Sequence, residues 1–187
     1  MVIAQPLMIR SALPAAILAL AAGPITGGAA APANLQPRHA HAQGLGTRLQ
    51  ATFTERPPLS RTADCATRPK ICQAVLKGSG SLKGFGPATE IVGLTEDHAV
   101  TPCGVGSESE AHTRRIQTTG GVLALRAVGV KCPTAAGFRV TARYQVDGAA
   151  STGMFAGAHG HGRDTVNLAI GSPNRVTITG SLRLHRS

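Results

Sequence analysis

The sequence is poor in aromatic and acidic residues and contains no tryptophan. Only 3% of its 187 residues are aromatic, and nine Asp and Glu stand against 19 Lys and Arg, which gives a formal net charge of +10 at pH 7. Because single-stranded nucleic acid is held largely by stacking on aromatic rings, this composition argues against base-specific recognition. Charged residues make up 15% and apolar residues 42% of the chain. This balance excludes a chain that is disordered along its whole length.

The motifs of several common enzyme classes are also absent. There is no Gly-x-Ser-x-Gly elbow, no Gly-Lys-Ser/Thr phosphate loop and no Asn-x-Ser/Thr glycosylation site. His159 and His161 would share one face of a strand, about 7 Å apart, but no spacing selects a third metal ligand. The sequence therefore assigns no catalytic residue, no metal ligand and no cofactor, and it favours a binding protein over an enzyme.

Long hydrophobic runs are missing except near the N-terminus. Residues 12–22 form one apolar run that follows Arg10. The run is shorter than the ~20 residues needed to cross a bilayer, and it has the length of a signal-peptide core. We expect residues 1–33 to be a signal peptide and the protein to be secreted and not membrane-spanning. Cleavage sites of the Ala-x-Ala type end at Ala33 and at Ala42, and both remain open.

If the protein is exported, its four cysteines are expected to form disulfide bonds. An even number of cysteines in an oxidising compartment predicts disulfide bonds, and four cysteines allow three pairings. Sequence proximity favours Cys65–Cys72, which leaves Cys103–Cys132. A zinc site is the rival interpretation, but neither pair shows the two-to-four-residue gap of a zinc knuckle.

The hydropathy pattern changes near residue 73. Residues 34–72 are basic and contain several prolines, which predicts an irregular N-terminal arm, and residues 34–60 of this arm are expected to add little to stability. From residue 73 to residue 187 polar and apolar residues alternate with period two, most strictly in residues 138–146 and 175–184. Further, weaker strands are predicted for residues 74–82, 89–94, 110–117, 122–130 and 165–170. Seven or eight short strands indicate an all-β antiparallel sandwich or barrel.

A glycine-rich stretch carries a family resemblance. Residues 148–162, GAASTGMFAGAHGHG, resemble a turn-and-strand motif of barrels related to allene oxide cyclase and to plant dirigent proteins. Residues 78–86, GSGSLKGFG, resemble the opening strand of secreted bacterial relatives of these barrels. The resemblance covers about residues 73–187 and departs from the motif at Ala149 and Ala150, which replace a usual Gly pair. It implies a closed eight-stranded antiparallel barrel with a central cavity.

Three functions follow as expectations. The first is binding of a small apolar ligand, without catalysis, in a roomy lumen lined by Val140, Tyr144, Val176 and Ile178, with Phe155 as a plug. The second is an isomerase or cyclase of the allene oxide cyclase type, which a buried acid or histidine in the cavity would favour. In the third, an envelope-associated protein binds anionic polymers through outward-facing arginines. The candidates for these are Arg139, Arg143, Arg175 and Arg183. The acids at 96–97 and 108–110 are expected to lie in solvated loops.

Overall fold

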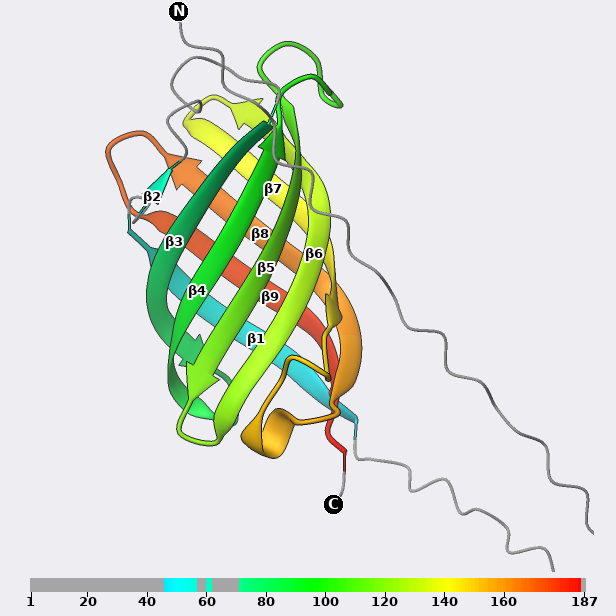
Figure 1. The fold of residues 1–187 in the computed structure, drawn as a ribbon. Coiled ribbons are helices and arrows are strands. Elements are labelled where there is room, and N and C mark those ends of the chain that lie inside the picture. Colours follow the sequence, from blue (N-terminus) through cyan, green and yellow to red (C-terminus); the bar gives the residue numbers. More distant parts are fainter. Residues whose placement is uncertain (1–45, 57–59, 62–70, 186–187) are drawn as a thin grey trace, which may run out of the picture. The chain divides into compact units, whose positions relative to one another are not determined.

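A computed structural model describes residues 46–56, 60–61 and 71–185 of the chain. The predicted signal peptide and Cys65 lie outside the described residues. The described part consists of antiparallel strands and one short 3-10 turn, η2 (Gly153–Phe155) (Figure 1). The strands are β1 (Gly46–Glu55), β2 (Ser60–Arg61), β3 (Ile71–Leu82), β4 (Gly86–Asp97), β5 (Glu108–Thr118), β6 (Gly121–Thr134), β7 (Gly137–Val146), β8 (His159–Ala169) and β9 (Asn174–Arg183).

The strands close into an eight-stranded barrel, as predicted. Their order is β1-β9-β8-β7-β6-β5-β4-β3-β2, and the sheet closes because β1 also pairs with β3. In this closing pair Ala51 lies opposite Leu82 and Glu55 opposite Gly78. The two-residue β2 pairs with β3 beyond this point. Closure leaves few free edges on strands that are rich in glycine, which protects them from pairing with other chains.

The first strand corrects the predicted N-terminal boundary of the barrel. Residues 46–55 fall within the range assigned to the irregular arm, yet they form β1 and pair along their whole length with β9. The burial pattern of β1 alternates, and Leu49 and Phe53 are 2% and 3% exposed. The arm prediction was therefore wrong for these residues. The prolines that suggested it all lie outside the strand: Pro37 precedes it, and Pro57, Pro58 and Pro69 follow it.

Inward-facing side chains divide the barrel interior into two parts. One end is apolar and is closed by the loop between β7 and β8, where Phe155 is 0% exposed and its ring lies 5.0 Å from that of Phe85. This confirms Phe155 as a plug, and we call this end the Phe155 end. Within the glycine-rich motif, Gly153 and Gly157 have positive φ values of 61° and 68°. Side chains other than glycine are strained there, so these glycines permit the tight turn that inserts Phe155.

The opposite end carries a disulfide, and we call it the disulfide end. Cys103, in the loop between β4 and β5, is bonded to Cys132 on β6 with a Cα–Cα distance of 5.8 Å. This confirms the predicted Cys103–Cys132 pair. The predicted Cys65–Cys72 pair involves a residue outside the described part, while Cys72 itself is buried and is not a free thiol. Within the described ranges, no helix has the length and apolarity to span a membrane.

Candidate functional site

A buried arginine organises the interior of the barrel towards the disulfide end. Arg114 lies on β5 and is only 1% exposed. Its Nη1 donates to Glu55 Oε1 at 3.0 Å and to a carboxylate oxygen of Glu90, and its Nη2 donates to Asp164 Oδ2 at 2.9 Å. Burial disfavours the charged guanidinium, but the carboxylates of Asp164, Glu90 and Glu55 outweigh this effect and raise the pKa of Arg114. Arg114 is therefore a permanent cation at the centre of three acids.

A buried histidine extends this cluster along the same strand. His112 Nδ1 lies 2.8 Å from Glu110 Oε1, and His112 Nε2 lies 2.9 Å from Asp164 Oδ2. Burial alone would lower the pKa of His112, but the hydrogen bonds to Asp164 and Glu110 raise it from 6.5 to about 9. At neutral pH the imidazole is thus protonated and donates to both carboxylates. We define the lumen cluster as Glu55, Glu90, Glu110, His112, Arg114 and Asp164.

Two acids of the lumen cluster have pKa values displaced in opposite directions. Burial raises the pKa of Glu90 from 4.5 to about 7, and the nearby Arg114 only partly offsets this. Burial would also raise the pKa of Asp164, but Arg114 and His112 bring it below its ordinary value. Paired acids with divergent pKa values are a common arrangement for acid–base chemistry, although structural ion pairs show it too.

A second group of charges lies at the disulfide end. Lys131 Nζ donates to Glu96 Oε1 at 2.8 Å and to Glu108 Oε2 at 3.0 Å, and His98 Nδ1 lies 3.0 Å from Glu108 Oε1. The side chains of Cys72, Glu96 and His98 also come within 4.8 Å of one another. Because Cys72 is disulfide-bonded, its sulfur is not a thiolate ligand, and this trio does not form a metal site.

Several buried polar atoms in and beside the lumen cluster have no hydrogen-bond partner among the described residues. They include Glu90 Oε1, Asp164 Oδ1 and the Tyr144 hydroxyl. The Tyr144 hydroxyl occupies space above Gly162 and Gly180, where an added Cβ would come within 2.5 Å and 2.3 Å of it. Buried polar atoms are normally satisfied by protein, water or a ligand.

The cavity beside the lumen cluster is small. It measures about 30 Å³, and its wall includes Glu55, Glu110 and Arg114 together with aliphatic side chains such as Val140 and Leu168. A water molecule requires roughly 10–15 Å³ measured in this way. The cavity therefore has room for one or two waters.

The four residues predicted to line the lumen do face the interior. Val140, Tyr144, Val176 and Ile178 are 2%, 2%, 2% and 0% exposed and belong to the main apolar core. The roomy apolar lumen expected from the sequence is not found around them, because their neighbours fill the space and the cavity wall is partly ionic.

The prediction of solvated loop acids was wrong. Glu96 and Asp97 lie within β4, and Glu108 and Glu110 lie within β5. Glu96 and Glu110 are each 6% exposed, and the other two are half-buried. A signal for this was present in the sequence. Ile116 is the apolar residue that marks the inward face of β5. Side chains on a strand alternate between its two faces, so the same face includes Glu110, His112 and Arg114.

The outer surface carries mainly basic side chains, in contrast to the acids buried in the interior. None of the eight acidic residues in the described ranges is exposed: five are buried and Asp97, Glu108 and Asp147 are half-buried. Nine arginines and two lysines of the same ranges are exposed. They are Arg48, Arg56, Arg115, Arg126, Arg139, Arg143, Arg163, Arg175, Arg183, Lys77 and Lys83. The fold thus directs the acids inward and the bases outward.

Six of these arginines lie together on one side of the barrel. Strands β7, β8, β9 and β1 are consecutive neighbours and lie behind the front strands β3 to β6 in Figure 1. Their outer face carries no acid. We define the arginine face as Arg48, Arg139, Arg143, Arg163, Arg175 and Arg183. It includes the four arginines predicted to face outward. Among the described residues only Arg139 of this face has a hydrogen-bond partner, Asn167 Oδ1 at 3.0 Å.

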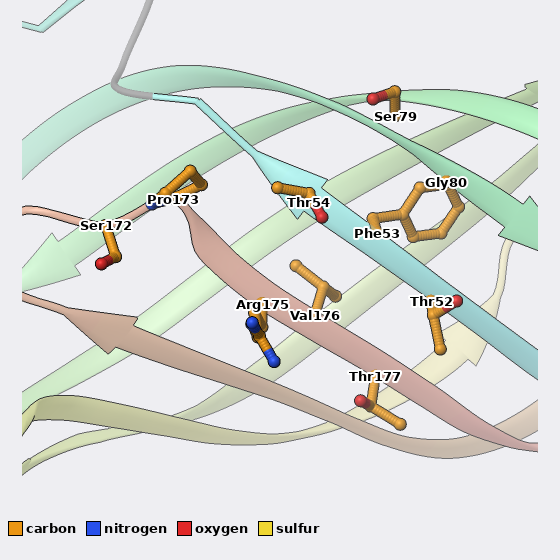
Figure 2. A pocket seen from close by; sticks show the side chains of 10 residues that line it. All are labelled: Thr52, Phe53, Thr54, Ser79, Gly80, Ser172, Pro173, Arg175, Val176 and Thr177. Atoms are coloured by element: carbon orange, nitrogen blue, oxygen red, sulfur yellow. The ribbon is translucent and has the colours of Figure 1, made fainter.

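A hollow of about 510 Å³ opens on the outer surface around Arg175. Figure 2 shows the hydroxyl-bearing side chains of three strands and a loop around it. They belong to Thr52 and Thr54 on β1, Ser79 on β3, Thr177 on β9 and Ser172 in the loop before β9. Phe53 and Val176 form its buried floor. His159 and His161 are exposed on β8, as interpreted from the sequence.

No protein-family model matches the chain, and no curated protein matches it significantly. The resemblance to allene oxide cyclase and dirigent barrels thus stays an expectation from the sequence motif.

Proposed function

We propose that this is a secreted barrel protein that binds an anionic polymer through its arginine face. The observation that carries the proposal is the separation of charge: among the described residues, five of eight acids are buried and none is exposed, while eleven bases are exposed. Such a surface creates a positive potential that attracts polyanions and releases their condensed counterions on binding. The disulfide between Cys103 and Cys132 supports an oxidising, extracellular location.

The identity of the bases supports the same proposal. Most exposed bases are arginines, and a guanidinium offers a planar fork of donors that matches phosphate, sulfate or carboxylate groups. Within the described part of the chain, none of the six arginines of the arginine face pairs with an acid, and only Arg139 has a hydrogen-bond partner, so most of their donors are available to a ligand. A bound anion would reduce the repulsion between the positively charged arginines of this face.

Retention on an immobilised polyanion tests the proposal. The test variant carries Arg139→Gln, Arg143→Gln and Arg163→Gln. The control variant carries Lys77→Gln, Lys83→Gln and Arg115→Gln, which remove the same charge from exposed positions outside the arginine face. We expect the test variant to elute at clearly lower salt than the control. Equal elution of the two variants would show that net charge alone is responsible and would contradict a binding face.

A second candidate function is binding of a small ligand in the lumen. The unpartnered atoms of Glu90, Asp164 and Tyr144 favour it, and the raised pKa of Glu90 beside an ionised Asp164 fits the isomerase or cyclase alternative. Because the cavity is about 30 Å³, a ligand larger than water requires the barrel interior to open. Stoichiometric binding of a fatty acid or hydrophobic dye, reduced by Tyr144→Ala, would support this candidate. Absence of any binding would leave the lumen as a structural ionic core.

A further inference from the structure

We propose that the hollow around Arg175 is the subsite that holds one phosphodiester unit of a phosphodiester-linked polyol chain. This inference rests on the proposed function, since it identifies the polymer that the arginine face binds. It depends on the geometry of three neighbouring strands, which brings one guanidinium and several hydroxyl groups around a single space (Figure 2).

The strand register places these donors side by side. Ser79 on β3 lies opposite Thr54 on β1, and Thr54 lies opposite Arg175 on β9. Two residues further along the same outer face, Thr52 of β1 lies opposite Thr177 of β9. Side chains directly opposite one another on adjacent strands have Cβ atoms about 5 Å apart. One tetrahedral anion can therefore reach donors from two rows at once.

The hydrogen-bond donors of the hollow are not engaged by the described part of the chain. Among the residues that the structure describes, neither the Arg175 guanidinium nor the hydroxyls of Thr52, Thr54 and Thr177 has a hydrogen-bond partner. The lining includes no carboxylate, because Glu55, the next residue along β1, points inward and is 3% exposed. The hollow is thus positive, rich in donors and open to solvent.

The mixture of donors favours a phosphodiester-linked polyol over other polyanions. A planar carboxylate engages the fork of one arginine but leaves hydroxyls on the other walls unsatisfied, whereas a phosphate presents oxygens in several directions. The serine and threonine hydroxyls can also accept hydrogen bonds from the polyol. Nucleic acid is less suited, since no aromatic side chain of the described residues is exposed for base stacking.

The test measures binding of a fluorescent poly(glycerol phosphate) oligomer to the full mature protein. Arg175→Gln is compared with Arg143→Gln, which removes the same charge from the arginine face outside the hollow. Thr177→Val keeps shape and charge but removes one hydroxyl. Poly-glutamate and duplex DNA serve as competing polyanions. All three positions are exposed, so the variants are expected to fold, and their unfolding midpoints are measured as a check.

We expect Arg175→Gln to weaken binding at least tenfold, Arg143→Gln only two- to threefold, and Thr177→Val several-fold for poly(glycerol phosphate) but not for poly-glutamate. Equal losses for the two arginine variants, with no effect of Thr177→Val, would overturn the subsite while leaving the arginine face intact. Tighter binding of duplex DNA, with the same sensitivity to Thr177→Val, would overturn the polyol assignment. Failure of the wild type to bind any of the polymers would overturn the proposed function itself.

Discussion

Arg143 on β7 and Arg163 on β8 lie directly opposite each other on the outer face of the barrel. Both side chains are exposed, and neither has an acidic partner among the described residues. Like charges directly opposite across a pair of strands destabilise the pair. The fold thus tolerates a local repulsion at a place where a bound anion would relieve it, which is the arrangement expected of a binding face.

The repulsion between Arg143 and Arg163 predicts that loss of one of these charges stabilises the folded protein. Arg163→Gln should raise the free energy of unfolding by about 0.2–1 kcal/mol at low salt, because it removes a cross-strand repulsion. The gain should shrink at high salt, where the repulsion is screened. Urea unfolding at two salt concentrations measures this, with Arg48→Gln as the control, since Arg48 lies opposite Ser181. Destabilisation by Arg163→Gln at low salt would contradict the account.

The lumen cluster predicts that stability declines as the pH rises from neutral to alkaline. His112 has a folded-state pKa of about 9 against 6.5 when unfolded, so its contribution is fully present below pH 6.5 and is lost as the pH passes about 9. Glu90, with a folded-state pKa of about 7, holds its proton in the folded state, so its contribution falls between pH 4.5 and about 7.

Thermal unfolding between pH 5 and pH 10 measures this decline. His112→Gln should flatten the curve above pH 6.5, whereas His161→Gln, on the exposed face of β8, should leave its slope unchanged. A wild-type midpoint that rises between pH 7 and pH 9 would show that His112 is not held as the cation.

Arg114 should contribute far more to the stability of the folded protein than the adjacent Arg115. Arg114→Met leaves the carboxylates of Glu55, Glu90 and Asp164 buried without their cation, and removal of one partner of a buried ion pair costs about 3–5 kcal/mol. Arg115→Gln alters an exposed side chain and should change stability by less than about 0.5 kcal/mol. Denaturant unfolding of the two variants compares them, and similar midpoints would contradict the buried ionic core.

The first strand should be indispensable to the barrel. Phe53→Ala should cost about 3–5 kcal/mol, since the ring is 3% exposed and belongs to the main core. Thr54→Ala, on the outer face of the same strand, should cost little. Measured unfolding free energies distinguish these outcomes. A small effect of Phe53→Ala would restore the earlier view that this segment is a dispensable arm.

The alternation of residue types predicted most of the barrel. Period-two patterning predicted that Val140 and Tyr144 face inward and that Arg139 and Arg143 face outward. The Phe155 plug was predicted from the glycine-rich motif that carries the family resemblance. The Cys103–Cys132 bond followed from the cysteine count and sequence proximity. The strand faces depend on residues close together in the sequence, so a local pattern is sufficient to predict them.

The lumen cluster was not predicted, because it depends on contacts between strands that are distant in sequence. Arg114 contacts Glu55 and Asp164, which are separated from it by 59 and 50 residues. Sequence patterning treats a charge on a strand as outward-facing, and only the closure of the barrel brings these opposite charges together. The β1 strand was missed for a different reason: Leu49, Ala51 and Phe53 alternate as in a strand, but the prolines on either side of them suggested an irregular arm.

The salt dependence of polymer binding tests the central claim most directly. The association constant for poly(glycerol phosphate) is measured from about 50 to 400 mM NaCl for the wild type and for the Arg143→Gln/Arg163→Gln double variant. If four to six phosphates contact the arginine face, the logarithm of the constant should fall with the logarithm of salt at a slope of about −3 to −4. The double variant should show a slope shallower by about 1 to 1.5. A wild-type slope near zero, or identical slopes in the two proteins, would contradict binding through the arginine face.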